Sequence, residues 1–430
     1  MFDDFQQVEA FLQSRRQHGV KPGLKRINRL LSLVGEPQKK MVAIHVAGTN
    51  GKGSTIRFMQ KALTANGYHI GVFQSPSLTG YTGHMLIDDT RIPCGTFMGY
   101  VTKLLPFIQQ LDDEHNHPTE FEIITAVAFL YFADNADIAL IETGMGGRED
   151  TTNCINPILS IITNVSRDHT AFLGGTLAAI AWQKAGIIKE NRPVIVGEMG
   201  DDARSVIAQE AFEANASLYL SGESFRYEVV DIAASHQTFQ WICDSGSRRE
   251  IVLQTTGMHQ VSNASLAIMA LKLLEDKGFT LDWPSCINAL AFVSIPGRFE
   301  QIHGLPAIIL DGAHNAGGVE TFTDTLQRHF ADMERHLIFA AFRDKDLKTM
   351  LEGLEPHFAS VTLTVFDHPR AASIQQLQQY SQHPAVQSVS DWREAVRQIS
   401  FQRENTCYCI TGSLHFIGIV RKYFDEIVGL

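Results

Sequence analysis

Short runs of apolar residues alternate along the chain with longer stretches in which apolar residues recur every three or four positions. The short runs are typical of buried parallel strands, and the longer stretches are typical of amphipathic helices. Because strands and helices take turns, we expect a mainly parallel sheet covered by helices. In the first half of the chain, strands are predicted at 41–48, 69–73, 138–144, 158–165 and 193–198.

The pattern changes twice further along the chain. From 225 to 253 it becomes polar and rich in β-formers, which predicts antiparallel hairpins, and a helix over 259–278 closes this part. The segment 292–300 holds Pro and Gly between periodic segments and is a candidate linker. Strands and helices then alternate again. We therefore predict two domains, 1–295 and 296–430.

Composition and charge narrow the class of protein. The formal net charge is −11 without a block of like charges, whereas a general binder of nucleic acid or anionic membranes would carry a basic patch. None of the six cysteines forms a CxxC pair, which favours free thiols in a reducing compartment. The N-terminus lacks the pattern of a signal peptide, and no apolar run approaches the roughly 18 residues of a membrane span. We expect a cytoplasmic protein, and no feature of the sequence asks for a dimer, so we expect a monomer.

The stretch HVAGTNGKGST, residues 45–55, joins a predicted strand to a predicted helix through a glycine-rich turn. Such a turn lets backbone amides approach a phosphate group at the start of a helix. Lys52 can neutralise phosphate charge, and Ser54 or Thr55 can reach a magnesium ion. The loop departs from the common GxxxxGK[ST] pattern because Gly53 separates Lys52 from Ser54. The alternative is that the glycines merely serve a tight turn.

Two further motifs follow predicted strands. Glu142 ends the strand of IETGMGGRED, and Asp168 with His169 follows the strand of NVSRDHT. Open α/β sheets bind ligands at the carboxyl ends of their strands, and a carboxylate there suits a hard cation. Taken singly, Glu142 could be a solvated strand end, and His169 could be structural. Three motifs at one edge of the sheet favour a site for a metal ion and a nucleotide.

At this point the motifs resemble those of a known family, the folylpolyglutamate synthases and dihydrofolate synthases of the Mur-ligase superfamily. The glycine between Lys52 and Ser54 is a feature of that family. The resemblance covers essentially the whole chain. It is carried, in order, by HVAGTNGKGST, SPSLTGY, TEFEIITAVAF, IETGMGGRED, DHTAFLG, KAGIIK, GMHQVSNASLAI, PGRFE, DGAHN, FRDKD, HPRAAS and TGSLHFIG.

The resemblance implies a fold and a set of ATP and metal residues. The fold is a P-loop ATPase-type domain with a mainly parallel sheet and a small β-rich part, followed by a Rossmann-like α/β domain. The positions that match ATP contacts are Thr49, Asn50, Gly51, Lys52, Gly53, Ser54, Thr55, Asn263, Arg298, Asp311 and His314. Those that match the ligands of two magnesium ions are Ser54, Glu142, His169 and Lys184. Asp311 and His314 lie beyond the linker, so we expect the second domain to close over ATP.

Lys184 matches a lysine that members of the family carry as a carbamate, which would turn a cation into a metal-binding anion. The alternative interpretation is that Lys184 is an ordinary lysine on the surface of a helix. For the substrates, the resemblance points to Ser75, Pro76, Phe121 and Asp150 on the folate side and to Arg370 and Ser413 near the incoming glutamate. A guanidinium suits a carboxylate, although an exposed arginine is often only a surface charge.

The chain also departs from the family pattern. Ser77 stands where the family commonly has His, which bears on the contacts with the pterin. Gln183 precedes Lys184 where an acidic residue is frequent, and His415 stands where an aromatic residue often follows GSL. GGRED differs from the commoner GGRLD, but Asp150 keeps the acidic position.

The activity implied is ATP-dependent addition of L-glutamate to a folate carboxylate through an acyl phosphate, with Lys52, Glu142, His169 and Lys184 as the central residues. Extension of tetrahydrofolate is our first choice, and synthesis of dihydrofolate from dihydropteroate is also compatible. One alternative is a Mur-type ligase for a UDP-sugar, which would normally carry a further N-terminal domain, whereas about 40 residues precede the loop. Two others are a P-loop ATPase switch without ligase activity and a folate-binding relic.

Overall fold

The computed structural model describes residues 2–19, 21–77, 79–233, 236–401 and 405–427. These residues form two compact units, each with its own sheet and core. The N-terminal unit comprises the described residues of 1–232, 237–254 and 260–293. The C-terminal unit comprises those of 294–430 together with two short segments, 233–236 and 255–259.

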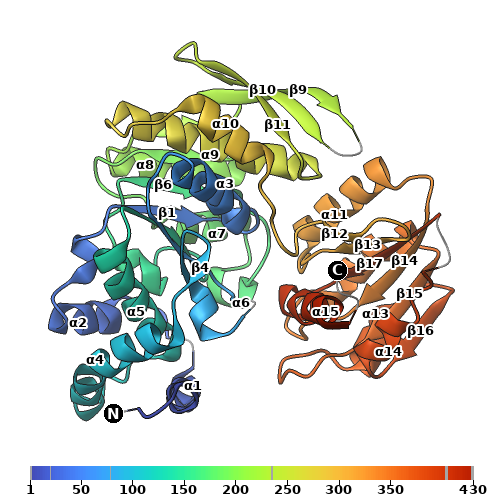
Figure 1. Ribbon diagram of the computed structural model, residues 1–430, viewed down its shortest axis with the longest axis horizontal. Helices are drawn as coiled ribbons and strands as arrows, with labels where there is room; N and C mark the ends of the chain where they lie inside the picture. Colours follow the sequence, from blue (N-terminus) through green and yellow to red (C-terminus); the bar gives the residue numbers. More distant parts are fainter. Residues whose placement is uncertain (1, 20, 78, 234–235, 402–404, 428–430) are drawn as a thin grey trace. The chain divides into compact units, whose positions relative to one another are not determined.

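An eight-stranded sheet organises the N-terminal unit, in the order β4-β3-β2-β5-β1-β6-β7-β8. Its strands β1, β4 and β6 are labelled in Figure 1. The strands β2, β5, β1, β6, β7 and β8 are parallel, and the hairpin of β3 and β4 adds an antiparallel edge. The bounds are β1 (Ala43–Ala47), β2 (Ile70–Phe73), β3 (Met85–Ile87), β4 (Thr90–Arg91), β5 (Ile138–Glu142), β6 (Leu159–Ile162), β7 (Val194–Val196) and β8 (Leu218–Leu220). The five strands predicted from apolar runs are all present. The short strands β3, β4 and β8 were not predicted, because two or three residues give no periodicity.

Helices cover this sheet through two separate apolar clusters. One packs the N-terminal helices and the helix pair α4 and α5 against β2 and β5, and the other packs α7 and α8 against β6 and β7. The helices of the unit are α1 (Phe5–Ser14), α2 (Lys25–Leu33), α3 (Lys52–Thr64), α4 (Cys94–Asp113), α5 (Glu120–Asn135), α6 (Thr170–Leu173), α7 (Leu177–Ala185), α8 (Asp201–Glu213), α9 (Met258–Asp276) and α10 (Trp283–Ala291).

The β-rich part predicted at 225–253 is a three-stranded antiparallel sheet in the order β11-β10-β9. Its strands are β9 (Phe225–Ile232), β10 (Gln237–Cys243) and β11 (Arg248–Leu253). The described residues also form five short 3-10 helices, η1 (Arg15–His18), η2 (Pro37–Lys39), η3 (Tyr81–His84), η4 (Thr151–Cys154) and η5 (Glu355–His357).

The C-terminal unit contains a six-stranded sheet in the order β12-β13-β17-β14-β15-β16, parallel except for β12. The helices α11, α12 and α13 bury one face, and α14 and α15 bury the other. The bounds are β12 (Glu300–His303), β13 (Ala307–Leu310), α11 (Ala316–His329), β14 (Glu334–Phe339), α12 (Leu347–Leu354), β15 (Ser360–Thr364), α13 (Ile374–Tyr380), β16 (Val386–Val389), α14 (Trp392–Arg397), β17 (Thr406–Thr411) and α15 (Leu414–Ile427). The edge strands β12 and β16 are largely solvated and were not predicted.

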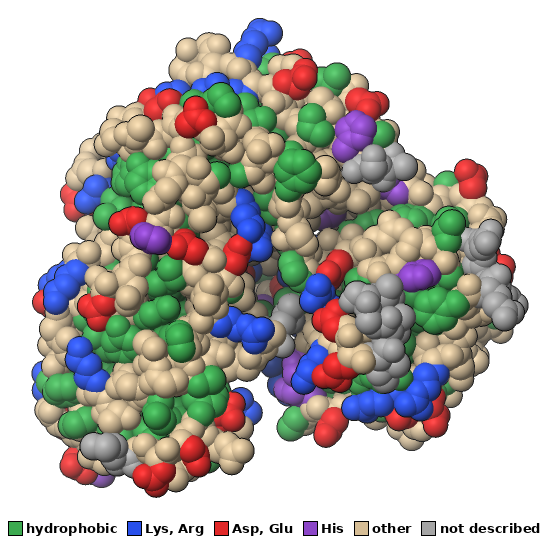
Figure 2. All heavy atoms as spheres, in the orientation of Figure 1, with side chains coloured by type: hydrophobic (Ala, Val, Ile, Leu, Met, Phe, Trp, Pro, Cys, Tyr) green, Lys and Arg blue, Asp and Glu red, His purple; other side chains and the backbone are tan. Residues whose placement is uncertain are grey.

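None of the described helices combines the length and apolar character needed to cross a bilayer. On the face of the molecule shown in Figure 2, basic and acidic side chains are interspersed.

Candidate functional site

The loop between β1 and α3 is shaped by two glycines that no larger residue could replace. Gly51 lies in the left-handed region, with φ of 83°, at the start of α3. Gly48, with φ of 153°, lies so close to Thr163 that an added Cβ would come within 1.8 Å of the Thr163 hydroxyl oxygen. The loop therefore needs glycine both for its backbone conformation and for its contact with the strand end beside it.

The segment that follows β6 holds this loop in place. The Thr163 hydroxyl donates to Asn50 O at 2.6 Å, and Asn164 Oδ1 accepts from Asn50 N at 2.9 Å. Thr49 Oγ1 is hydrogen bonded to the backbone of Ser166, as acceptor from its N–H at 3.0 Å and as donor to its carbonyl at 3.1 Å. Sequence reasoning did not single out Thr163, Asn164 or Ser166. The available signal was their place at the carboxyl end of the strand predicted over 158–165.

The Lys52 ammonium group lies inside the loop that precedes it. Its Nζ donates to Gly48 O at 3.0 Å and to Thr49 O at 3.3 Å, and it lies 3.8 Å from Glu142 Oε1. The two hydroxyl residues of the motif, Ser54 and Thr55, are buried in the first turn of α3. The Thr55 hydroxyl is without a hydrogen-bond partner among the described residues, although water cannot reach it. A buried unpartnered hydroxyl is costly unless a ligand uses it.

Glu142 is the last residue of β5 and is 7% exposed. Its position opposite Val46 in the parallel ladder brings its carboxylate to the phosphate loop, because β5 and β1 are neighbours in the sheet. Glu142 Oε2 also accepts from Ser75 N at 3.4 Å, and it would lie 3.8 Å from a Cβ built at Gly53. The structure thus places Lys52, Glu142 and Ser75 together, from three segments far apart in the sequence.

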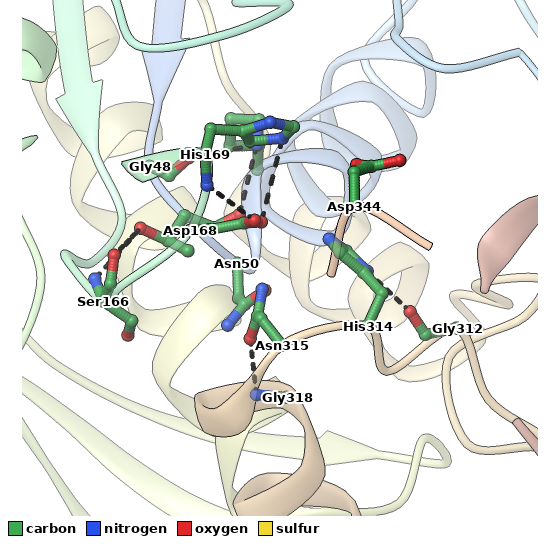
Figure 3. Close-up of polar contacts among 12 residues, drawn as sticks. Gly48, Asn50, Ser166, Asp168, His169, Gly312, His314, Asn315, Gly318 and Asp344 are labelled. Carbon is green, nitrogen blue, oxygen red and sulfur yellow. Dashed lines mark hydrogen bonds and ion pairs between the residues drawn. The ribbon is translucent and has the colours of Figure 1, made fainter. Parts of the chain in front are cut away.

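Asp168 and His169 follow β6 and form a local pair, visible in Figure 3. His169 begins α6 in the left-handed region, with φ of 49°, and its N–H donates to Asp168 Oδ1 at 2.8 Å. Its Nε2 lies 3.8 Å from Asp168 Oδ2. The Asp168 side chain is 9% exposed and the His169 ring is 38% exposed. The imidazole therefore remains accessible to solvent, beside a carboxylate that is nearly buried.

Lys184 is buried in α7, with 3% of its surface exposed, so it is not the surface lysine of the alternative reading. Burial and the charge of Lys52 lower its pKa to about 7, against the opposing influence of Asp168 and Asp150. Burial is possible because glycines let α7 contact the loop after β5. A Cβ at Gly147 would lie 2.7 Å from Gln183 O and 2.8 Å from Lys184 O.

The remaining folate-side candidates border the same edge of the sheet. The Phe121 ring, on α5, lies 5.9 Å from the ring of Phe73, and a Cβ at Gly144 would come within 2.8 Å of it. Asp150 is buried at the end of the loop that follows Glu142. Ser75 and Pro76 lie between β2 and η3, and the Ser77 hydroxyl donates to Gly80 O at 2.6 Å within that loop.

Asn263 lies against the phosphate loop from α9. A Cβ at Gly51 would come within 2.3 Å of Asn263 Oδ1, and the Asn263 amide nitrogen donates to Gln260 Oε1 at 3.2 Å. The N-terminal unit thus assembles Lys52, Ser54, Glu142, Lys184 and Asn263 around one strand-to-helix turn. Among the described residues, no three His, Cys, Asp or Glu side chains are grouped as a metal ion would require.

In the C-terminal unit, Asp311 follows β13 and organises the turn that leads into α11. Its two carboxylate oxygens accept from Phe299 N and from Ala313 N, both at 2.7 Å. Burial raises the pKa of the Asp311 carboxyl, and the Arg298 guanidinium opposes the rise. Figure 3 shows His314 with its Nδ1 hydrogen bonded to Gly312 O, at 2.8 Å. Asp311 thus holds the backbone on both sides of β13, while Arg298 and His314 flank it.

Arg370 is paired with a carboxylate of the protein itself. Its guanidinium forms two hydrogen bonds to Asp344, at 3.0 and 2.8 Å, and lies over the Phe342 ring at 4.7 Å. The pair is about half exposed. A substrate carboxylate would share this arginine with Asp344, a partner that sequence reasoning did not identify.

Ser413 precedes α15 and is 1% exposed. Its hydroxyl has no hydrogen-bond partner within the described part of the chain. His415, where the family often has another aromatic residue, packs in an aromatic cluster with His368 at 5.0 Å and Phe366 at 5.6 Å between ring centroids.

Comparison with known proteins places this arrangement in a family. The chain matches the Mur ligase middle domain over residues 46–271 and the glutamate ligase domain of Mur ligases over residues 297–414. It is 35% identical, over 98% of its length and 99% of the relative's, to the dihydrofolate synthase/folylpolyglutamate synthase of Bacillus subtilis. The folylpolyglutamate synthase of Lacticaseibacillus casei is 32% identical over 93% of both chains.

Solved structures extend the likeness to three dimensions. The Mycobacterium tuberculosis folylpolyglutamate synthase, complexed with ADP and AMPPCP, superimposes with a TM-score of 0.89 at 30% identity and 98% coverage of both chains. An Escherichia coli structure in complex with DHPP and ADP gives a TM-score of 0.88 at 25% identity, covering 99% of this chain and 98% of that one.

Proposed function

The chain belongs to the folylpolyglutamate synthase and dihydrofolate synthase family of Mur ligases, and from this premise we propose how its residues carry out the reaction. It is an ATP-dependent ligase that joins L-glutamate to a folate carboxylate. The single observation that carries the residue assignments is the meeting of Lys52 and Glu142 across neighbouring strands, 3.8 Å apart, at the glycine loop.

The reaction needs an activated carboxylate, because an unactivated one would have to expel oxide. Transfer of the γ-phosphoryl group of ATP to the folate carboxylate gives an acyl phosphate, from which phosphate can leave. The neutral amine of glutamate then attacks the acyl carbon. No side-chain nucleophile is required, so the residues act by positioning the substrates and stabilising charge.

Within this scheme, the loop of Gly48–Gly51 offers its backbone to the phosphates of ATP. Lys52 leaves its contacts with Gly48 O and Thr49 O for the phosphoryl oxygens and neutralises the charge that develops there. The buried, unpartnered hydroxyl of Thr55 gives the loop a further donor for a ligand. Asn263 keeps Gly51 in position from α9.

We further propose that magnesium accompanies ATP. Ser54 and Glu142 supply the oxygen atoms that this hard cation prefers, and His169, beside Asp168, is accessible to a second ion. Bound magnesium would stabilise negative charge on the transferring phosphoryl group. The residues fit this role because hydroxyl and carboxylate groups converge on the phosphate loop, where Glu142 lies near Lys52 and Gly53.

Lys184 is proposed to act as a carbamate. An ammonium group buried near Lys52 is unfavourable, whereas a carbamate would place an anion there and add an oxygen ligand for the second ion. Labelling with ¹³C-bicarbonate should give a carbamate resonance in the wild type that Lys184→Arg lacks. An identical resonance in both proteins, or none in either, would remove the carbamate from the mechanism.

Tetrahydrofolate is our first choice of acceptor, with dihydropteroate as a second. The deciding experiment measures ADP release with MgATP and L-glutamate while each acceptor is added in turn. Turnover with tetrahydrofolates alone is expected for a dedicated polyglutamate synthase, and turnover with both for a bifunctional enzyme. Equally fast ADP release without any pterin would refute the ligase mechanism and indicate an ATPase.

A further inference from the structure

A buried chain of hydrogen bonds runs from the centre of β1 to the loop that follows Glu142. His45 Nε2 lies 2.9 Å from Thr152 Oγ1, and Thr152 Oγ1 lies 2.5 Å from Asp150 Oδ1. His45 and Thr152 are both fully buried, and Asp150 is 7% exposed. Sequence reasoning gave no role to His45 or to Thr152, and the proposed reaction does not use them.

The chemistry of the three groups fixes the direction of this chain. Asp150 accepts backbone N–H donors on both oxygens, from Thr152 at 3.0 Å and from Met145 at 2.7 Å. Burial raises the pKa of this carboxyl, and the hydrogen bonds that it accepts oppose the rise, so we assign it as a carboxylate. The Thr152 hydroxyl must then donate its single proton to Asp150. Its oxygen is left to accept a hydrogen bond, and His45 therefore donates through Nε2–H.

This direction leaves His45 Nδ1 without a proton. Among the described residues it also has no hydrogen-bond partner. Burial lowers the His45 pKa to about 3, in keeping with a neutral ring. A buried nitrogen without a hydrogen-bond partner destabilises the folded protein. An apolar residue at position 45 would pack without this destabilisation.

The network ends on the loop that follows Glu142 and carries Asp150. Asp150 Oδ2 accepts a hydrogen bond from Met145 N, and Asp150 N donates to Gly147 O at 3.1 Å. The side chain and the backbone of Asp150 thus close the loop over residues 143–150. Glu142 directly precedes the loop. His45 itself lies three residues before Gly48, opposite Ile141 in the ladder of β1 and β5. One chain of hydrogen bonds thus ties the strand of the phosphate loop to the loop after Glu142.

We propose that His45 and Thr152 are positioning residues that fix the Asp150 carboxylate, and with it the 143–150 loop, in the geometry needed to bind the folate substrate. The inference rests on the proposed function, in which Asp150 belongs to the folate side of the site. The two residues act through Asp150 and do not touch the reacting atoms.

The test uses the full-length protein and a pair of matched variants. Thr152→Val keeps the shape of the side chain and removes the hydroxyl, whereas Thr152→Ser keeps the hydroxyl. We expect Thr152→Val to raise the KM for the folate substrate at least about tenfold, because a hydrogen bond to an ionised group is lost. The KM for ATP should change less than about twofold, and Thr152→Ser should restore the folate KM. Because Thr152 acts through Asp150, Thr152→Val should add little to the folate KM of Asp150→Asn.

A purely structural role predicts a different result. Thr152→Val would then lower the thermal unfolding midpoint and leave the folate KM at the wild-type value, which would overturn the inference. If Thr152→Val does not fold, the folate KM is compared between His45→Met and His45→Gln instead, since only Gln retains an N–H donor. Wild-type protein without folate-dependent ADP release would refute the proposed function instead, before any variant is compared.

Discussion

At the scale of single residues, the site depends on polar groups that the fold buries close to one another. Lys52 and Glu142 come from different motifs, and Lys184 is withdrawn from water although it carries an amine. Each of these groups has a neighbour that alters its charge or orientation. The reaction therefore depends on these side chains together. We expect a substitution of any one of them to lower the reaction rate more than the stability of the fold.

Replacing Lys52 with Ala should lower folate-dependent ADP release at least about 100-fold, since a preorganised charge at the transferred phosphoryl group is lost. Lys61→Ala is the matched control, because Lys61 lies on the same helix but pairs with Asp89 on the surface. Both variants should keep the wild-type unfolding midpoint within a few degrees. Wild-type rates in Lys52→Ala would exclude this residue from the mechanism.

The neutral His45 ring predicts how stability depends on pH. Its pKa is about 3 in the fold against 6.5 for an unperturbed histidine, so between these values the unfolded chain binds a proton that the folded chain does not. Stability therefore falls as the pH drops below about 6.5, by up to about 1.4 kcal/mol per pH unit from this residue. The thermal midpoint of His45→Gln should fall less than that of the wild type between pH 7 and pH 5. Parallel curves would show that His45 does not titrate in this way.

At the scale of elements, glycine decides how closely a loop and a helix approach. The loop after β5 touches the carbonyl groups of α7 at Gly147, and that contact keeps Lys184 beneath it. The phosphate loop similarly rests on Thr163 at Gly48. The contact at Gly147 is with backbone carbonyl oxygens, which no change of rotamer can move, whereas the contact at Gly48 is with the side-chain hydroxyl of Thr163.

Gly147→Ala should destabilise the N-terminal unit by about 1–3 kcal/mol, because the added methyl group meets two backbone oxygens that cannot move independently. Turnover should fall with it, since Lys184 and the 143–150 loop are displaced. Gly175→Ala is the control, because a Cβ there meets nothing within 4 Å. Equal unfolding midpoints for the two variants would contradict the close contact.

At the scale of the whole molecule, the residues that we propose for binding ATP and glutamate are divided between two units. The phosphate loop and Glu142 belong to the N-terminal unit, whereas Arg298, His314 and Ser413 belong to the C-terminal unit. We therefore expect substitutions in the C-terminal unit to alter turnover even though the phosphate loop is untouched.

Ser413→Ala tests this division. It should raise the KM for glutamate about tenfold or more while leaving the unfolding midpoint unchanged, because the Ser413 hydroxyl has no partner to lose among the described residues. Thr411→Val is a suitable control, since the Thr411 hydroxyl is also buried without a partner in the described chain. A glutamate KM that is unchanged in Ser413→Ala would remove Ser413 from the substrate site.

The order of residues along the chain was enough to predict most of the buried strands and the kind of chemistry. Apolar runs predicted the central strands, because a parallel strand is buried on both faces, and the glycine loop followed by Lys52 indicated a phosphate site. Short and solvated strands such as β4 and β16 escaped prediction for the same reason, since little or none of their surface is buried.

Which side chains meet could be known only from the folded chain. Thr163 and Ser166 support the phosphate loop, Asp344 pairs with Arg370, and His45 reaches Asp150 through Thr152. Most of these contacts join residues more than 25 positions apart, and each residue looks ordinary in its own segment. Periodicity reports the face that a residue turns to the core, whereas a hydrogen bond depends on how separate strands are ordered in the sheet. That order is set by packing over the whole unit, which is why it had to be seen in three dimensions.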